Sequence, residues 1–206
     1  YIILIGLMTG LFRWTNFWDF PIYFVVCGFV IFFMNMRTYR HDPFRFLFIT
    51  LLNFAEIAVI GVLAALPFTL NFSMISSEIR LTYSHSAFYQ LAILWGLPFA
   101  VVIAFLFTLI GEFRRRSRAV SADEASGSEE KRKKARGNAF IRMLNSIDVT
   151  DLTVVLFGFC AIGLVILPEL IYVKDIYTAS HYRSNTMFKL TYQAFILFGI
   201  SMGYIL

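Results

Sequence analysis

Residues 44–66 read FRFLFITLLNFAEIAVIGVLAAL, an apolar run that holds two charged residues, Arg45 at its start and Glu56 midway. A helix needs roughly 20 apolar residues to cross the hydrocarbon of a bilayer. This run is long enough and therefore predicts a transmembrane helix. Of the chain's 206 residues, 59% are apolar and only 15% are charged. This composition indicates an integral membrane protein and excludes a soluble domain.

Further apolar runs lie on both sides of residues 44–66 and predict an all-α, polytopic transmembrane helix bundle. We expect five full spans and a partial one at the N-terminus, in a single transmembrane domain, residues 1–206, cut from a longer chain. The expected helices are 1–12 (partial), 20–36, 44–66, 88–111, 152–167 and 188–206.

Helix ends can be read from caps and prolines. Asp42 before Pro43 is typical of an N-cap followed by proline at the first helical position. Thr150 and Asp151 are expected to cap the fifth span. Pro67 and Pro168 are expected to stop their helices, because proline lacks a backbone N–H. Pro21 fits the first turn of its span, and Pro98 predicts a kink.

Lysine and arginine are unevenly shared between the two sides of this topology. Thirteen fall in loops 37–45 and 112–151, and five fall on the other side. Because cytoplasmic loops are rich in lysine and arginine, loops 37–45 and 112–151 should be cytoplasmic. Loops 13–19, 67–87 and 168–187 should be external, in a multi-pass protein of the cell membrane.

The long cytoplasmic loop, 112–148, is the most polar part of the chain. Its central part, 119–138, is low in complexity and rich in charge, so we expect it to be partly disordered. Residues 139–149 place apolar side chains on one helical face and predict a short interfacial helix. Its basic cluster is typical of a topology signal and of contact with anionic lipid, and nucleic acid is not expected as a partner.

Charged residues gather in the expected external loops. Glu169 and Asp175 are followed by Arg183, Asn185 and Lys189, and we expect 169–177 to form a short interfacial helix. Basic groups beside carboxylates suit a phosphate ligand. An ion-paired loop with aromatic anchors is the other interpretation.

Two further carboxylates stand out. Asp19 lies between aromatic residues at the same expected face and either joins the external site or caps the helix that contains Pro21. Glu56 lies in mid-membrane, where a charge is costly and is usually retained for function. The alternative is a protonated Glu56 hydrogen-bonded to Asn53, Asn35 or backbone. The histidines lack the spacing of zinc ligands, and Cys27 and Cys160 are expected to be free.

Three stretches together resemble the signatures of the YYY membrane proteins, a poorly characterised family of archaea and bacteria. Residues 16–23 (NFWDFPIY) resemble its first signature, N-x-W-D-x-P-x-Y. Leu66, Pro67 and Phe68 with Asn71 and Phe72 fit the pattern that follows. The second signature is matched by Glu169, Tyr172, Asp175, Arg183, Asn185, Thr186, Phe188, Lys189, Tyr192 and Gln193.

The family is believed to resemble C-type (GT-C) glycosyltransferases, which use polyprenyl-phosphate sugars as donors on the external face. The resemblance implies that this chain is the later part of such a domain, with the main catalytic acid upstream of residue 1. It makes Asp19, Glu169 and Asp175 candidate catalytic residues, the last two as acceptor-orienting groups or as ligands of Mg²⁺ or Mn²⁺. Candidates for substrate binding are Arg183, Asn185, Lys189, Tyr192 and Gln193.

Three functions are compatible with the sequence. The first is a membrane glycosyltransferase that binds a polyprenyl-phosphate-linked sugar. The second is a non-catalytic subunit that keeps this fold in a complex with other membrane subunits. The third is a transporter, which Glu56 and Pro98 would serve, although no internal repeat accompanies them.

Overall fold

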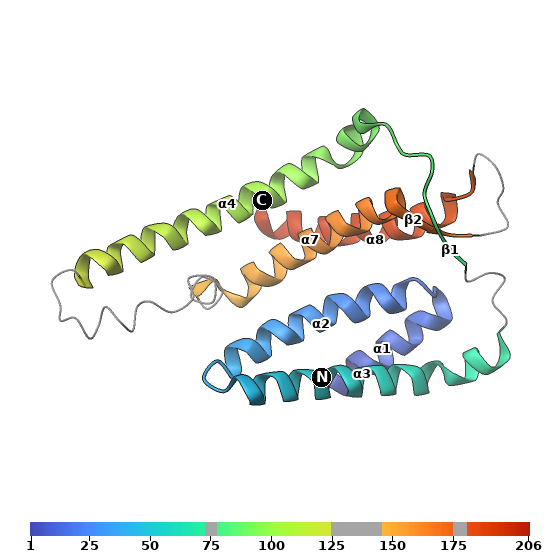
Figure 1. The fold of residues 1–206 in the computed structure, drawn as a ribbon, viewed down its shortest axis with the longest axis horizontal. Coiled ribbons are helices and arrows are strands. Elements are labelled where there is room, and N and C mark those ends of the chain that lie inside the picture. The colour runs from blue at the N-terminus through green and yellow to red at the C-terminus, as the bar shows by residue number, and fades with distance from the viewer. Residues whose placement is uncertain (73–77, 125–145, 175–180) are drawn as a thin grey trace.

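The computed structural model describes residues 1–72, 78–124, 146–174 and 181–206. Six helices and one two-stranded ribbon lie within these ranges (Figure 1). In chain order they are α1 (Ile2–Thr15), α2 (Asp19–Thr38), α3 (Pro43–Asn71), β1 (Ile79–Leu81), α4 (Phe88–Glu124), α7 (Val149–Leu170), β2 (Ile171–Val173) and α8 (Ser184–Ile205).

The predicted all-α membrane bundle is confirmed. In the described part of the chain, α2, α3, α7 and residues Phe88–Arg115 of α4 are each long and apolar enough to cross a membrane. The helix α1 is a shorter apolar helix. The helix α8 has the 22-residue length of α7, but Lys189, Thr191 and Gln193 make it more polar. That α8 spans the membrane stays a prediction.

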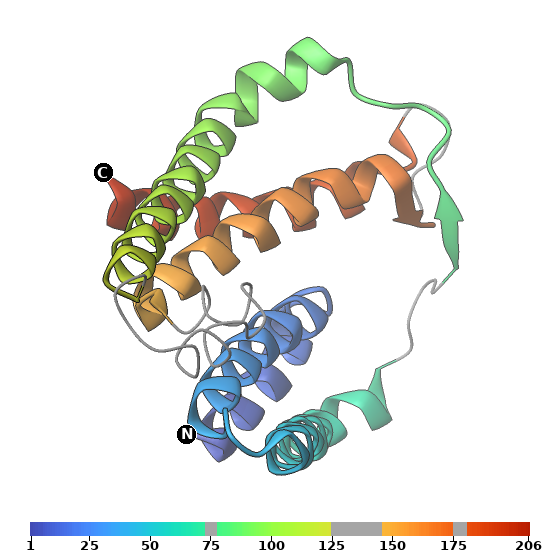
Figure 2. The same ribbon diagram turned by 60° about the vertical axis from the view of Figure 1, so that its left-hand side comes forward.

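The first three helices pack on one another (Figure 2). Small residues form the contact between α1 and α3. A Cβ atom added to Gly10 of α1 would come 2.6 Å from both the Ala64 Cβ and the Gly61 carbonyl oxygen of α3. One added to Gly6 would come 2.7 Å from the Ile60 Cβ. Gly6 and Gly10 are four residues apart, the spacing that lets membrane helices approach closely. Packing of α1 against α3 therefore depends on glycine.

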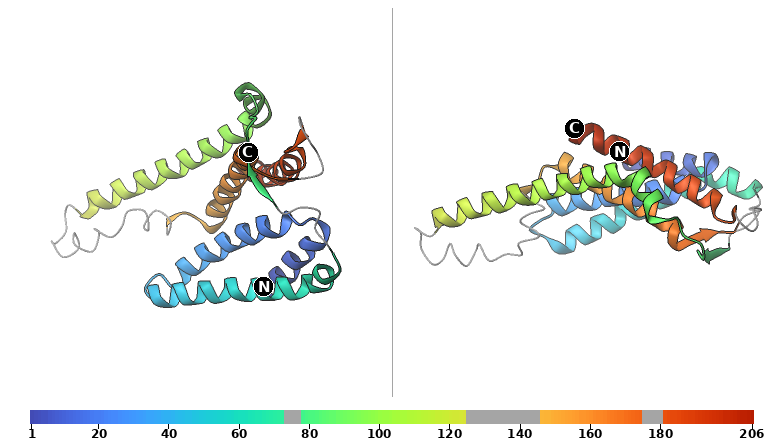
Figure 3. Two further views of the ribbon diagram at one scale, coloured as in Figure 1. Left: turned by 45° about the vertical axis from the view of Figure 1, so that its right-hand side comes forward. Right: turned by 90° about the horizontal axis from the view of Figure 1, so that it is seen from above.

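The remaining helices form a second group around α7 and α8, which lie side by side over most of their length (Figures 1 and 3). Their shared core also includes α2, whose inner face contacts α7 and so joins the two groups. This core consists of Ile22, Val26, Val102, Ala161, Leu164, Val165, Leu190, Ala194, Leu197 and Phe198.

The ribbon joins the two groups at one end of the bundle. The strands β1 and β2 pair antiparallel, with Arg80 opposite Tyr172. We call this end, where α2 and α8 begin and α7 ends, the ribbon end; it corresponds to the face expected to be external. The helix expected at 169–177 is therefore wrong for residues 171–173, because β1 supplies backbone partners that no local pattern reveals. Residues 175–177 lie outside the described ranges.

The two prolines expected to stop helices do not do so. The helix α3 continues past Pro67 to Asn71, and α7 continues past Pro168 to Leu170. Carbonyl groups near these ends find other donors: Asn71 Nδ2 donates to the Pro67 oxygen at 2.7 Å, and Thr82 Oγ1 donates to the Pro168 oxygen at 3.0 Å. The carbonyls that lose a ladder bond to these prolines are those of Leu63 and Leu164, four residues earlier, so the contacts above stabilise the helix ends and do not replace the missing bonds.

Two other helix ends test the expected caps. Asp42 caps α3 as expected, accepting a hydrogen bond from the Arg45 N–H at 2.9 Å, with Pro43 at the first position. The cap of α7 is Asp148 and not Thr150 or Asp151, because the Asp148 side chain accepts from the Thr150 N–H at 2.8 Å. The sequence also indicated that the span 152–167 gains a turn from Asp148 to Asp151, and α7 includes this turn from Val149 on.

The expected cytoplasmic loop, 112–148, is only partly described. Its first part is helical, because α4 continues to Glu124. The low-complexity residues from 125 onward and most of the expected interfacial helix, 139–149, lie outside the described ranges.

We expect Gly10→Ala to destabilise the protein, because the new methyl group would meet a backbone carbonyl that cannot move aside. Overpacking of this kind costs about 1–3 kcal/mol. Gly199→Ala is the matched control, since nothing lies within 4 Å of its added Cβ. Thermal unfolding in detergent should show a lower midpoint for the first variant only. Equal midpoints would contradict close packing of α1 on α3.

Candidate functional site

A polar cluster at the ribbon end joins residues that are far apart in sequence. Gln193 Nε2 of α8 donates a 2.8 Å hydrogen bond to Asp19 Oδ1 of α2. Asn16 Nδ2 donates to the same oxygen at 2.8 Å, and the Tyr23 hydroxyl donates to Gln193 Oε1 at 2.6 Å. Gln193 is buried, whereas Asp19 is half-buried. Two neutral amides thus fix the carboxylate of Asp19 on one side.

The other carboxylate oxygen of Asp19, Oδ2, has no hydrogen-bond donor among the described residues. Lys189 lies one turn before Gln193 on α8 and close enough for its charge to act on Asp19, although it forms no ion pair with a described carboxylate. Asp19 begins α2 without capping it through its side chain, so the expected capping role is not observed.

An apolar groove begins beside this cluster and runs along the bundle between α2 and α7, with a volume of about 470 Å³. No charged residue lines it. Trp18 and Phe29 mark its ends on α2, which at 1.5 Å per residue gives a length of roughly 16 Å. Its lining residues are Trp18, Pro21, Ile22, Val25, Val26, Phe29, Leu156, Phe159, Cys160, Gly163, Leu164, Leu167 and Leu190. Two of these lining residues, Trp18 and Leu190, are the chain neighbours of Asp19 and Lys189.

Glu169 and Arg183 form a closed ion pair at the same end. Arg183 Nη1 lies 2.7 Å from Glu169 Oε2, and the two side chains are 13% and 14% exposed. Ser86 donates to both carboxylate oxygens, from its N–H at 2.8 Å and its hydroxyl at 2.7 Å. Arg183 also donates to the Pro168 carbonyl and to Ser86 Oγ. The pair thereby ties the end of α7 to the start of α8 and to the segment before α4.

Tyr182, which precedes Arg183 in the chain, is the centre of a tyrosine cluster. The Tyr182 ring stacks on Tyr83 with centroids 4.1 Å apart and meets Tyr172 edge-on at 4.5 Å. Its hydroxyl accepts a 2.9 Å hydrogen bond from the Ser84 N–H. Sequence analysis missed Ser86 and Tyr182. The alternation of Thr82, Ser84 and Ser86 was the available signal, since side chains two apart in an extended segment lie on one face.

The structure brings some of the predicted site residues together and separates others. Tyr192 is exposed on α8 beside Gln193, and its ring stacks on Phe188. Asn185 lies in the first turn of α8 and is half-buried. Asp175 lies outside the described residues. Glu56 is exposed on α3, and its suggested partner Asn35 donates instead to Thr50 Oγ1 at 3.2 Å.

Among the described residues, no three histidine, cysteine, aspartate or glutamate side chains lie close enough together to bind a metal ion. Both oxygens of Glu169 already accept hydrogen bonds from Ser86. The described residues therefore do not fit the suggested Mg²⁺ or Mn²⁺, and no chemical step is assigned to a metal.

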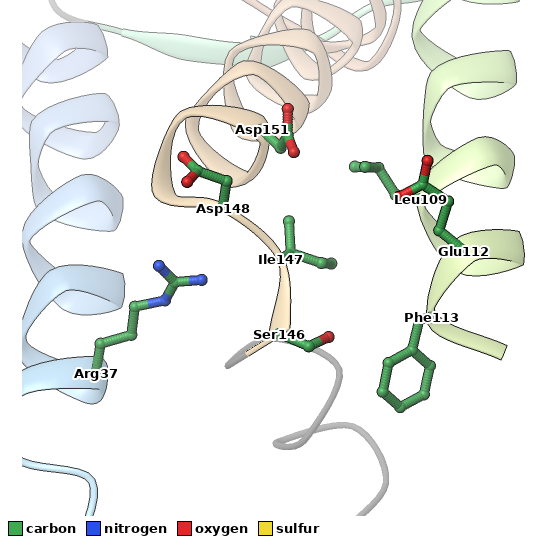
Figure 4. Close-up of a pocket in the computed structure, with 8 residues that line it drawn as sticks. All are labelled: Arg37, Leu109, Glu112, Phe113, Ser146, Ile147, Asp148 and Asp151. Atoms are coloured by element: carbon green, nitrogen blue, oxygen red, sulfur yellow. The ribbon is translucent and has the colours of Figure 1, made fainter. Parts of the chain in front are cut away.

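A second polar pocket, of about 440 Å³, lies at the opposite end of the bundle (Figure 4). Arg37 of α2 extends toward Asp148, and Glu112 of α4 and Asp151 of α7 line the other side. The Thr150 N–H, which donates to Asp148, lowers the pKa of this carboxyl below its ordinary value of 3.8. The Tyr204 hydroxyl donates to Asp151 at 2.8 Å.

Helices that cross the membrane several times, with a polar cluster at one end, define this molecule as a polytopic α-helical membrane protein. The chain belongs to a family described as uncharacterised membrane protein (DUF2298), whose model matches residues 1–198. The expectation of an uncharacterised membrane family is thus confirmed. No curated protein and no solved structure matches the chain.

We expect Glu169→Gln and Arg183→Met each to destabilise the protein, because either change leaves a buried charge unpaired. The cost of breaking such a pair is about 3–5 kcal/mol. The double variant should be more stable than either single variant, as thermal unfolding in detergent can measure. Glu78→Gln with Arg80→Met is the control, since this 2.7 Å pair is 50% and 47% exposed and should contribute nothing measurable. Unchanged stability of both single variants would exclude an anchoring role.

We expect Asp148→Ala to lower the unfolding midpoint at neutral pH, because the ionised carboxylate caps α7. Since the folded-state pKa is depressed, this stabilisation is present above the ordinary pKa and is lost as the pH falls through the folded value. The difference between Asp148→Ala and the native protein should therefore shrink below pH 3.8. Asp148→Asn is the control, because asparagine caps a helix without a charge. A difference that did not change with pH would contradict capping by the ionised form.

Proposed function

We propose that this chain is part of an integral membrane glycosyltransferase that takes a sugar from a polyprenyl-phosphate donor at the ribbon end. One observation carries the proposal: the apolar groove between α2 and α7 is lined by Trp18 and Leu190, the chain neighbours of Asp19 and Lys189. A polyprenyl-linked sugar has an apolar chain, an anionic phosphate and a polyhydroxyl head in that order. The groove is an apolar environment for the chain, Lys189 supplies a positive charge for the phosphate, and the amide-carboxylate cluster supplies polar groups for the sugar.

The proposed chemistry follows from charge. In the reaction, the acceptor hydroxyl loses its proton, its oxygen bonds to the anomeric carbon, and the bond from that carbon to the phosphate oxygen breaks. The polyprenyl phosphate leaves with the electron pair. A base near the acceptor and a cation near the phosphate both accelerate such a step.

Asp19 is the best placed of the candidate bases, because its Oδ2 is open while two amides orient the carboxylate. Lys189 is the proposed phosphate contact, and Gln193 and Tyr192 are proposed to bind the sugar. Glu169 and Arg183 are proposed as positioning residues, because they already satisfy each other. Asp175 and Asn185 stay candidates for the acceptor side of the site.

A non-catalytic subunit is the second candidate, and the closed Glu169–Arg183 pair is the observation that favours it. Both side chains of this pair already have partners within the protein, so the pair is as compatible with a purely structural role as with a role in an enzyme. The transporter hypothesis gains nothing from Glu56, because this residue lies on the exposed side of α3 and not toward the bundle interior.

We expect Asp19→Asn to reduce sugar transfer by roughly 10²–10⁴-fold, the usual contribution of a general base. Donor binding should persist, because asparagine keeps the shape of the side chain. The intact protein would be reconstituted in liposomes with a labelled polyprenyl-phosphate sugar, and both turnover and donor binding would be measured. Lys189→Gln should instead weaken donor binding.

Lys174→Gln is the matched control, because Lys174 is an exposed lysine at the same end that pairs with Glu78 at 3.4 Å. Donor binding without turnover in the native protein would favour the subunit. If the native protein shows no donor binding and no turnover, both the proposed donor and the assignment of the groove to its polyprenyl chain are excluded.

A further inference from the structure

Glu56 lies at the middle of α3, with 13 residues before it and 15 after it in a 29-residue helix. At 1.5 Å per residue it is roughly 20 Å from either end of the helix. A glutamate side chain cannot reach either membrane surface from that depth. Its carboxyl group must therefore be stabilised within the hydrocarbon region.

The face of α3 that carries Glu56 is turned away from the bundle. Leu52, Val59 and Leu63, which lie within about 60° of Glu56 around the helix axis, are 42%, 57% and 61% exposed. The face centred about 120° around the axis from Glu56 is buried and holds the polar residues Thr50 and Asn53. Glu56 is thus the one ionisable residue at mid-depth on an otherwise apolar outer face of the described α3.

No described residue satisfies Glu56 within these helices. Neither a hydrogen bond nor an ion pair joins it to any residue in the ranges that the structure describes. The basic residue nearest along the same face, Arg45, is eleven residues away, which is roughly 16 Å along the helix. Arg45 instead lies over the Tyr39 ring at 5.1 Å.

A second copy of the chain could not supply the missing charge. Arg45 and Lys189 are the only basic residues inside the apolar runs of the sequence, each is the second residue of its run and so lies far from mid-span, and none lies between Arg45 and Arg80. A basic residue at the depth of Glu56 must therefore come from a helix outside residues 1–206. Carboxylates in membranes are typically paired with such a residue, because an unpaired charge in hydrocarbon is costly.

We propose that the outer face of α3 binds a transmembrane helix that carries a lysine or arginine at mid-span, which pairs with Glu56. Leu52, Val59 and Leu63 would pack around this pair and exclude lipid from it. The proposal is independent of sugar transfer, because the outer face of α3 is separate from the cluster around Asp19.

A photo-crosslinking experiment on the intact protein in its native membrane tests the proposal. A benzoylphenylalanine placed at Leu63 should give a protein adduct, and mass spectrometry of that adduct should find an apolar span with a lysine or arginine near its middle. The same probe at Leu94 of α4, which is 64% exposed, is the control. It should label lipid.

Glu56→Leu should abolish the Leu63 adduct, and Glu56→Gln should reduce it. Glu56→Lys should abolish it too, and changing the partner's basic residue to glutamate should restore it. This rescue separates a lost pair from a misfolded protein. Labelling of lipid alone, an adduct with a second copy, a captured span without a basic residue, or an adduct unaffected by Glu56→Leu would each overturn the proposal.

Discussion

The constraint on which this structure depends is that every polar group inside hydrocarbon must find its partner within the protein. Helices satisfy the backbone, and the polar side chains of the core follow the same rule. Asn35 donates to Thr50 between α2 and α3. Ser201 of α8 donates to the Leu197 carbonyl of its own helix and the Val154 carbonyl of α7. These polar contacts fix which helix faces meet, because lipid competes equally well for apolar surfaces.

Sequence predicted what local physics controls. Apolar runs of membrane length gave the helices, and Asp42 before Pro43 gave the start of α3. The sequence-based prediction was wrong where a segment far away in the sequence supplies the hydrogen-bond partner. The helix α7 continues past Pro168 to Leu170, and Thr82 and Arg183 stabilise this end of the helix by donating to the Pro168 carbonyl. Residues 171–173 form a strand because residues 79–81 lie beside them.

The sequence predicted many of the residues that gather at the site but not which of them contact one another. Positive-inside reasoning grouped Asp19, Glu169 and Arg183 at one face, and the structure places all three at the ribbon end. The contact of Asp19 with Gln193 joins residues 174 positions apart, and no spacing rule could reveal it. The alternation of Thr82, Ser84 and Ser86 indicated a shared face but not its partner, so the contact of Ser86 with Glu169 was not predicted either.

The two carboxylates at the ribbon end differ in how completely the protein satisfies them. Glu169 receives two hydrogen bonds from Ser86 and the charge of Arg183, so a ligand would have to break native contacts to reach it. Asp19 is held through one oxygen by neutral amides, and its charge is not cancelled by a contacting cation in the described chain. A saturated pair suits a scaffold, because removing either member is costly. A half-satisfied carboxylate beside an apolar groove instead retains the capacity to take a proton or bind a ligand, which is why the proposed chemistry is placed at Asp19.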